Sequence, residues 1–189
     1  KWSAMTGVNT LFNGLLNTPG FEQLDFSTVK VVVGGGAAVQ KPVAERWQQV
    51  TGCSITEGYG LTEASPVACA NPIGTPWNGT IGIPYPSTEL TIRDAVFAEL
   101  PPWTGAGDIE KFTGEICVRG PQVMKGYWNS PAETAKVMQD GWLRTGDIGH
   151  MDGNGWFTIT DRKKDMILVS GFNVYPNEVE SVVATLPGV

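Results

Sequence analysis

The sequence predicts an α/β protein in three parts: a βαβ portion of a parallel sheet, a small antiparallel β-barrel-like region, and the start of a small α+β domain. A β-branched run at 29–33 precedes a helical apolar pattern over 40–51 and a second short strand at 55–58. After residue 80 the apolar segments are short and are separated by Gly and Pro. A charged stretch at 161–165 then separates two compact patterns, which is typical of a domain boundary.

The first 70 residues are predicted to form the βαβ portion. Residues 8–16 are typical of a short helix. The run at 29–33 is followed by three glycines, as in a buried strand that leads into a tight loop. Apolar residues then recur at helical spacing over 40–51, with Pro42 in the first turn and Gly52 at the end. Strand, helix and strand at this spacing predict parallel pairing.

Residues 71–160 are predicted to be mainly β-structure. The strand-like pieces lie at 82–84, 89–93, 115–119 and 156–160. We expect a long exposed loop over 94–113 and a short helix over 132–138, opened by Pro131. The sequence DGNG at 152–155 predicts a hairpin turn before the last strand.

The charged stretch predicts a division near Asp161, into a first domain over 1–160 and a second unit over 161–189. The second unit begins with an apolar strand at 166–169 and a Ser170-Gly171 turn. A helix then starts at Pro176, and its apolar face is predicted to contain Val179, Val182, Val183 and Leu186.

Composition excludes several classes of function. Of 189 residues, 13 are Lys or Arg and 19 are Asp or Glu, so the formal net charge is −6. This argues against a nucleic-acid-binding module, which needs a basic face to neutralise phosphates. No apolar run is long enough to span a bilayer, and the N-terminal residues do not form a signal peptide, so we expect a soluble protein. Three widely spaced cysteines and one histidine predict neither a disulfide framework nor a zinc site.

Polar segments follow both predicted parallel strands, and ligands bind at the carboxyl ends of such strands. The segment 34–38 (GGGAA) lets the backbone approach a ligand closely, but it lacks the dinucleotide-binding and Walker A patterns and also fits a simple turn. In the segment 59–63 (YGLTE), the Tyr ring can stack on a base, the Thr hydroxyl can bind a phosphate and the Glu can hold Mg²⁺. A surface turn with an incidental aromatic ring is the alternative.

Two later segments carry charge. Residues 142–147 (WLRTGD) place the carboxylate of Asp147 after a glycine turn. There it can accept hydrogen bonds from a ribose diol, or bond its own backbone as turn-forming Asp residues do. Residues 161–165 (DRKKD) contain three cations, which can meet phosphates or form a solvated charged surface.

Together, the order and separation of these segments resemble the adenylate-forming superfamily, which includes acyl-CoA synthetases, luciferases and the adenylation domains of peptide synthetases. The stretch 140–147 (DGWLRTGD), continued by 161–178 (DRKKDMILVSGFNVYPNE), is similar to the signature region of long-chain fatty-acid–CoA ligases. The resemblance covers essentially the whole chain, and 94–113 is its least typical part. It implies that 1–160 form the C-terminal part of a large AMP-binding domain, and that 161–189 form the hinge and the beginning of the small C-terminal domain.

The resemblance implies a reaction in two steps and a place in fatty-acid metabolism. A fatty acid attacks the α-phosphate of ATP, pyrophosphate leaves, and the thiol of coenzyme A then displaces AMP from the acyl-adenylate. AMP is a far better leaving group than a carboxylate oxygen, and the first step depends on positioning and charge neutralisation more than on a base. ATP, Mg²⁺ and coenzyme A are therefore the expected cofactors and co-substrates.

The same resemblance implies roles for individual residues. Tyr59 stacks on adenine, Thr62 contacts the phosphate and Glu63 holds Mg²⁺, while Asp147 binds the ribose hydroxyls and Arg162 contacts the ribose or phosphate side. The segment 34–38, called the glycine loop below, borders adenine and the acyl pocket. Lys164 matches the hinge between the large and the small domain, and the turn at 170–173 lines the pantetheine tunnel. The predicted catalytic residues are thus Thr62, Glu63, Arg162 and Lys164. The predicted nucleotide- and coenzyme-binding residues are Gly36, Ala37, Ala38, Tyr59, Gly60, Thr62, Asp147, Arg162, Ser170, Gly171 and Phe172.

Two motifs of the family do not occur within the chain: the Gly/Ser/Thr-rich loop that wraps pyrophosphate, and the lysine that contacts the carboxylate and phosphate. We therefore expect this stretch alone to be inefficient in adenylation. The alternatives are an adenylating enzyme for another acid or acceptor, such as an aryl-CoA ligase or a fatty acyl-AMP ligase, and a non-catalytic nucleotide- or acyl-binding module. Similar ligases are soluble or peripherally attached at the cytoplasmic face of a membrane, so a cytoplasmic location is expected.

Overall fold

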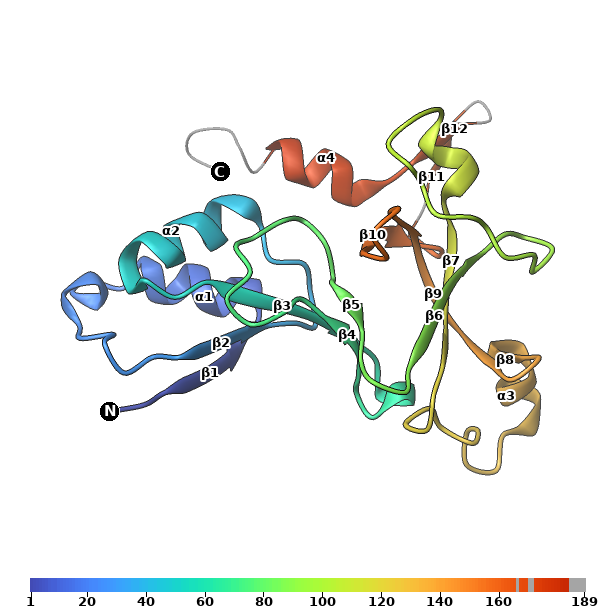
Figure 1. Cartoon of the computed structure of the whole chain (residues 1–189), viewed down its shortest axis with the longest axis horizontal. Helices are drawn as coiled ribbons and strands as arrows, with labels where there is room; N and C mark the ends of the chain where they lie inside the picture. The colour runs from blue at the N-terminus through green and yellow to red at the C-terminus, as the bar shows by residue number, and fades with distance from the viewer. Residues whose placement is uncertain (166, 170–171, 184–189) are drawn as a thin grey trace.

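Two sheets form the framework of the fold (Figure 1). The computed structural model describes residues 1–165, 167–169 and 172–183. The first sheet has the strand order β1 (Ala4–Gly7), β2 (Val31–Gly34), β3 (Ile55–Gly60), β4 (Val67–Ala70) and β5 (Ile83–Pro84). Its first three strands are parallel, as the βαβ pattern predicts, and its last two join in antiparallel fashion.

The helices of the first part are α1 (Asn9–Leu16), η1 (Phe21–Gln23), α2 (Lys41–Thr51) and η2 (Thr62–Ala64). The bounds of α1 and α2 agree with the predicted 8–16 and 40–51. In α2, Pro42 lies in the first turn, and Gly52 ends the helix with a φ of 71°, a left-handed conformation that glycine adopts without strain.

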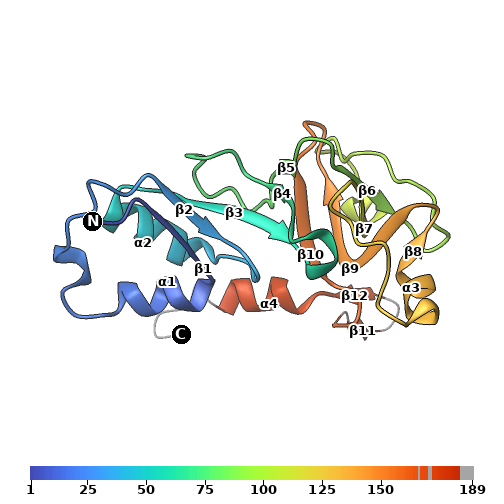
Figure 2. The same cartoon turned by 90° about the horizontal axis from the view of Figure 1, so that it is seen from below.

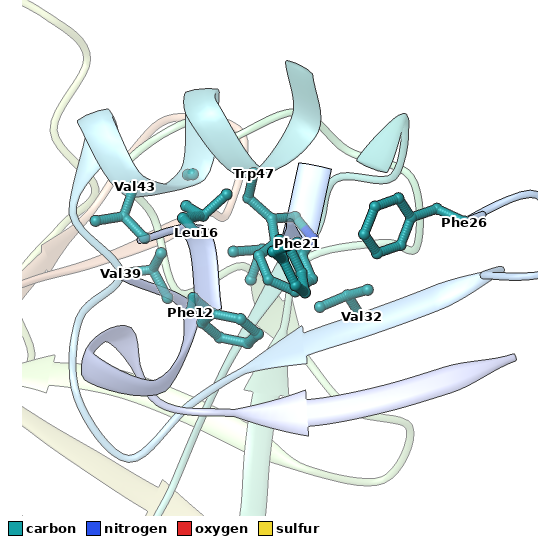
Figure 3. Close-up of a cluster of buried hydrophobic side chains, with 10 residues drawn as sticks. Phe12, Leu16, Phe21, Phe26, Val32, Val39, Val43 and Trp47 are labelled. Atoms are coloured by element: carbon teal, nitrogen blue, oxygen red, sulfur yellow. The ribbon is translucent and has the colours of Figure 1, made fainter. Parts of the chain in front are cut away.

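The main core lies between the two helices and the first sheet (Figure 3). Phe12 of α1 and Trp47 of α2 are fully buried, and their ring centroids are 4.9 Å apart at an interplanar angle of 70°. Val32 of β2 faces the same cluster. Because α2 buries one apolar face while its charged residues remain exposed, packing holds the helix on the sheet.

The second sheet is antiparallel. Its order is β10 (Phe157–Arg162), β9 (Trp142–Met151), β7 (Gly114–Arg119) and β6 (Glu89–Arg93), with β8 (Met138–Gln139) also on β9. The helices η3 (Ile109–Phe112) and α3 (Pro131–Val137) lie in its connections, and η3 interrupts the predicted long loop. Beyond it come β11 (Ile167–Val169), β12 (Phe172–Val174) and α4 (Pro176–Val183). In both views α4 extends from the second sheet toward α1 and α2 (Figures 1 and 2).

Short backbone contacts join the two sheets. Ile81 N–H donates to Phe157 O at 2.8 Å, and Phe157 N–H donates to Gly82 O at 2.9 Å. The predicted piece at 82–84 therefore lies in the first sheet, as β5, and is bridged to the antiparallel sheet through Gly82. This bridge sets the position of β3 relative to β9 and β10, which carry the candidate site.

Several features differ from the sequence prediction. The strands β1 and β4 are not predicted, because AMTG and VACA contain few β-branched residues. They are stabilised by pairing, β1 with β2 and β4 with β3 and β5. The first predicted strand begins at Val31, because Lys30 N–H and Val31 N–H both bond Ser3 O before regular pairing starts. Gly146 and Asp147 belong to a bulge inside β9, where residues 145–147 lie opposite Ile116 of β7, and not to a turn.

In the charged stretch 161–165, residues 162–165 are exposed, as expected, and Asp161 alone is buried. Asp161 is only 3% exposed, because it and Arg162 extend β10 along β9. In α4, the valines of the predicted apolar face, Val179, Val182 and Val183, are exposed. Met166, Ser170, Gly171 and Leu186 lie outside the described residues. Within the part of the chain that is described, no helix has the length and apolar character needed to cross a membrane.

We predict that Gly82→Ala destabilises the protein and that Gly14→Ala does not. Gly82 has a φ of 88°, and a Cβ there would collide with the backbone of Ala70. The left-handed conformation alone costs about 1–2 kcal/mol for a non-glycine residue. At Gly14, within α1, a Cβ would meet no other atom within 4 Å, so alanine should stabilise that helix by about 0.5–1 kcal/mol. Thermal unfolding followed by circular dichroism should show opposite shifts, and equal midpoints would contradict the close approach at Gly82.

Candidate nucleotide-binding site

The two sheets meet at a hydrogen bond between predicted site residues. Tyr59 Oη, from β3, donates to Asp147 Oδ2, from β9, at 2.5 Å. The Tyr59 ring is 8% exposed and packs with Ala68, Cys69 and Val118. Burial, together with the charge of Asp147, raises the pKa of the Tyr59 hydroxyl, so the phenol remains a donor. The contact brings together two side chains that are 88 positions apart in sequence.

The bulge in β9 aims the carboxylate of Asp147. Gly146 has a φ of 77°, and the N–H of Asp147 donates to Thr145 Oγ1 at 3.1 Å. Arg162 is the pairing partner of Asp147 in β10, and its Nε lies 3.5 Å from Asp147 Oδ1. Burial raises the pKa of Asp147, while the Tyr59 hydrogen bond and the Arg162 charge act in the opposite direction. The carboxylate therefore has a donor or cation on each oxygen.

The glycine loop lies against β3. A Cβ on Gly35 would be 3.1 Å from Gly58 O, so the loop runs close beside the residue that precedes Tyr59. Gly36 has a φ of 78°, and it, Ala37 and Ala38 are exposed. At the end of the loop, Val39 N–H donates to Glu57 Oε1 at 2.9 Å. Burial raises the pKa of Glu57 to about 7, although the Val39 hydrogen bond lowers it in part.

The residues after Tyr59 form a tight connection. A Cβ at Gly60 would collide with the carbonyl of Pro66, which explains the glycine. Thr62 and Glu63 then lie in η2, with Thr62 exposed. The main chain of Glu63 accepts a hydrogen bond from Met124 N–H at 2.7 Å, and its Oε1 accepts one from Tyr127 Oη, also at 2.7 Å.

The residues present near Glu63 suit Mg²⁺ better than a transition metal. Within the described ranges, no group of three or more His, Cys, Asp or Glu side chains could hold a metal ion by itself. Mg²⁺ is commonly held by one or two carboxylates together with water and substrate phosphates. The single, partly exposed carboxylate of Glu63 fits that mode, and Tyr127 bonds only one of its two oxygens.

The structure brings some of the predicted residues together. Asp147 contacts both Tyr59 and Arg162, and the glycine loop adjoins the same strand as Tyr59. Glu63 is held by Tyr127, on a different connection. Lys164 is exposed in the turn after β10. Phe172 is described only as part of β12, and the predicted Ser170 and Gly171 lie outside the described residues.

Sequence reasoning missed Glu57, Glu115 and Tyr127. Glu57 and Glu115 lie inside predicted strands, and a carboxylate within a buried strand requires a specific partner. That signal was present in the sequence. Tyr127 is part of an irregular connection, and its contact with Glu63 depends on a separation of 64 residues that no local pattern indicates.

We predict that Glu57→Gln stabilises the protein more at pH 8 than at pH 5. The pKa of Glu57 rises from its ordinary 4.5 to about 7 on folding, because the site is buried. The folded state therefore holds a proton that the unfolded state releases between these values, and stability is lost as pH rises through them. Each pKa unit corresponds to about 1.4 kcal/mol, so the difference between the two pH values should be on the order of 2 kcal/mol. Unfolding midpoints of both proteins test this, and a pH-independent difference would contradict it.

Known proteins resemble the chain over its full length. The family described as AMP-binding enzyme matches residues 1–128. A long-chain-fatty-acid–CoA ligase of Escherichia coli O6:H1 is 53% identical over 189 residues, covering 100% of this chain and 32% of that protein. A feruloyl-CoA synthase of an Amycolatopsis species is 37% identical, covering 97% of this chain and 36% of that protein. The chain thus spans about a third of the length of the curated relatives it matches.

A solved structure confirms the fold class. The crystal structure of ATP-bound MatB from Rhodopseudomonas palustris superposes with a TM-score of 0.87 at 34% identity. The superposition covers 100% of this chain and 36% of that chain, and so includes both the parallel strands and the antiparallel second sheet. With a family match over 1–128 of its 189 residues, the chain belongs to the AMP-binding enzyme family.

Proposed function

We propose that the protein carrying this chain is an ATP-dependent acid–thiol ligase that activates a fatty acid, preferably one with a long chain, as an acyl-adenylate and transfers it to coenzyme A. The observation that carries this proposal is the contact of Tyr59 with Asp147 across the two sheets, beside an exposed glycine loop. The identity of 53% with a long-chain-fatty-acid–CoA ligase supports the same substrate class.

In this proposal the chain's own residues bind and orient the nucleotide. Asp147, held by Tyr59 and Arg162, accepts hydrogen bonds from the ribose hydroxyls. The exposed backbone of the glycine loop, with Gly36, approaches adenine and the acyl group. The Tyr59 ring borders adenine, and the hydroxyl of Thr62 donates to a phosphate. Catalysis then rests on the alignment of the acid with the α-phosphate, because an adenylating step needs little base chemistry.

Glu63 is the proposed residue that holds Mg²⁺, with the remaining ligands from phosphate and water. An ion held there would supply positive charge that offsets the charge of the phosphates. Tyr127 bonds one carboxylate oxygen of Glu63 and would orient the group, as outer hydrogen bonds do for metal ligands.

The division of the chain is also proposed. Residues 1–160 would belong to the large AMP-binding domain, and 161–189 would form the hinge and the beginning of the small domain. Lys164 is the proposed pivot, since it lies exposed in the turn just after β10 ends. The segment 170–173 would line the path of the pantetheine group. A cytoplasmic location fits this chemistry, with peripheral attachment to a membrane as a further proposal.

A second candidate is an adenylating ligase for another acid. The feruloyl-CoA synthase at 37% identity and the MatB structure at 34% identity favour it, because their names differ from those of fatty-acid ligases. The two candidates share the nucleotide site and differ in the acid. An assay of thioester formation with the complete protein, over acids of increasing chain length and an aryl acid, separates them. Exclusive use of the aryl acid would overturn the fatty-acid proposal.

We predict that Asp147→Asn weakens ATP binding by the complete protein by about tenfold or more, because a charge-assisted hydrogen bond contributes about 1.5–3 kcal/mol. The matched control is Asp140→Asn, which makes the same change at an exposed turn residue with a φ of 50°, a conformation that asparagine tolerates. Calorimetric titration with ATP provides the measurement. Equal ATP affinities of the two variants would remove the proposed role of Asp147.

A further inference from the structure

Glu115 is a buried carboxylate at the centre of a polar network in the second sheet. It lies in β7 and is 7% exposed. Its Oε2 accepts hydrogen bonds from Arg144 Nε at 3.1 Å and Arg144 Nη2 at 2.7 Å, and lies 3.3 Å from Lys163 Nζ. Its Oε1 accepts one from Gly146 N–H at 3.1 Å. One side chain therefore links β7, β9 and the turn that follows β10.

The network keeps this carboxylate ionised. Burial by itself would raise the pKa of Glu115, but the hydrogen bonds and charges of Arg144 and Lys163 outweigh it and hold the pKa below its ordinary value. A buried charge without partners would be strongly destabilising, so these donors are needed for the side chain to remain at this position.

The network also holds the peptide groups on either side of Gly146. The N–H of Gly146 donates to Glu115, and its carbonyl accepts a hydrogen bond from Lys163 N–H at 2.8 Å. Gly146 has a positive φ and immediately precedes Asp147, so its orientation determines where the Asp147 carboxylate points. Lys163 immediately precedes Lys164, the proposed hinge. Glu115 thus contacts the residue before the ribose-binding acid and the residue before the hinge.

We propose that Glu115 is a positioning residue for the nucleotide site: it fixes the Gly146 peptide, and so orients Asp147, while its contact with Lys163 joins the residue before the proposed hinge to β7. This inference rests on the proposed function. The base of the hinge then stays with the large domain, and the ribose contact is preserved when the chain beyond Lys163 moves.

The alternative is that Glu115 is merely one more cross-strand ion pair, and the same sheet offers a matched control. Glu89 of β6 accepts hydrogen bonds from Arg119 of β7, at 3.0 Å from Nε and 2.5 Å from Nη2. This pair has the same chemistry and spans neighbouring strands, but it is exposed and makes no contact with the bulge in the described structure.

The test compares Glu115→Gln, Lys163→Met and Glu89→Gln in the complete protein by calorimetric titration with ATP, and by KM and kcat for ATP and fatty acid. Glu115→Gln should weaken ATP binding about tenfold and raise the KM for ATP, with the KM for fatty acid unchanged. Lys163→Met should weaken ATP binding about threefold, since its side chain is half exposed. Glu89→Gln should match the unaltered protein.

Three results would overturn the inference: ATP affinity of Glu115→Gln equal to that of Glu89→Gln, an equal loss of affinity for ATP and fatty acid, or unchanged ATP affinity in Lys163→Met. If Glu115→Gln does not fold, the ATP affinity of Lys163→Met decides whether the inference holds. Lys163 is at the surface, so its substitution should leave folding intact. If the unaltered protein binds no ATP, the proposed function fails as well. If the unaltered protein binds ATP and neither Glu115→Gln nor Lys163→Met changes the ATP affinity, this inference fails and the proposed function stands.

Discussion

The hydrogen bond from Tyr59 to Asp147 is the contact on which the candidate site depends. It joins a strand of the parallel sheet to a strand of the antiparallel sheet, and each partner is largely buried. A buried phenol and a buried carboxylate both lose hydration on folding, so each requires the other. The backbone bridge between Gly82 and Phe157, and the packing of Tyr59 against Val118, join the same two sheets.

Four carboxylates lie in or near a site that is proposed to bind a polyanion, and their surroundings resolve this conflict. Glu57 has a pKa of about 7 and is partly protonated at neutral pH. Glu115 is neutralised by two cations. Asp147 is held by a phenol and faces Arg162. Among the contacts described, Glu63 has one oxygen bonded to Tyr127 and no cationic partner, so it is the acid assigned to Mg²⁺.

Local sequence patterns predicted the parts of the fold that local chemistry determines. The helix over 40–51 follows from its apolar spacing and from Pro42 and Gly52, and the TGD and YGLTE segments could be located without coordinates. The strand β1 and the bulge at Gly146 could not, because both depend on pairing with residues far away in sequence. Local patterns can therefore indicate which residues contact a nucleotide. They do not indicate which hydrogen-bond donors fix those residues in place, because the donors are distant in sequence.

The same distinction separates the residues that contact the nucleotide in our proposal from those that support them. Tyr59 and Asp147 lie in motifs whose order indicates a function, whereas the sequence shows only that Glu115 needs a partner, and the partner is identified once β9 is placed beside it. Its pairing with Arg144 would be satisfied without Gly146. The second oxygen bonds the peptide next to Asp147, so the same buried carboxylate pairs with Arg144 and contacts the bulge, which is the arrangement proposed for a positioning residue.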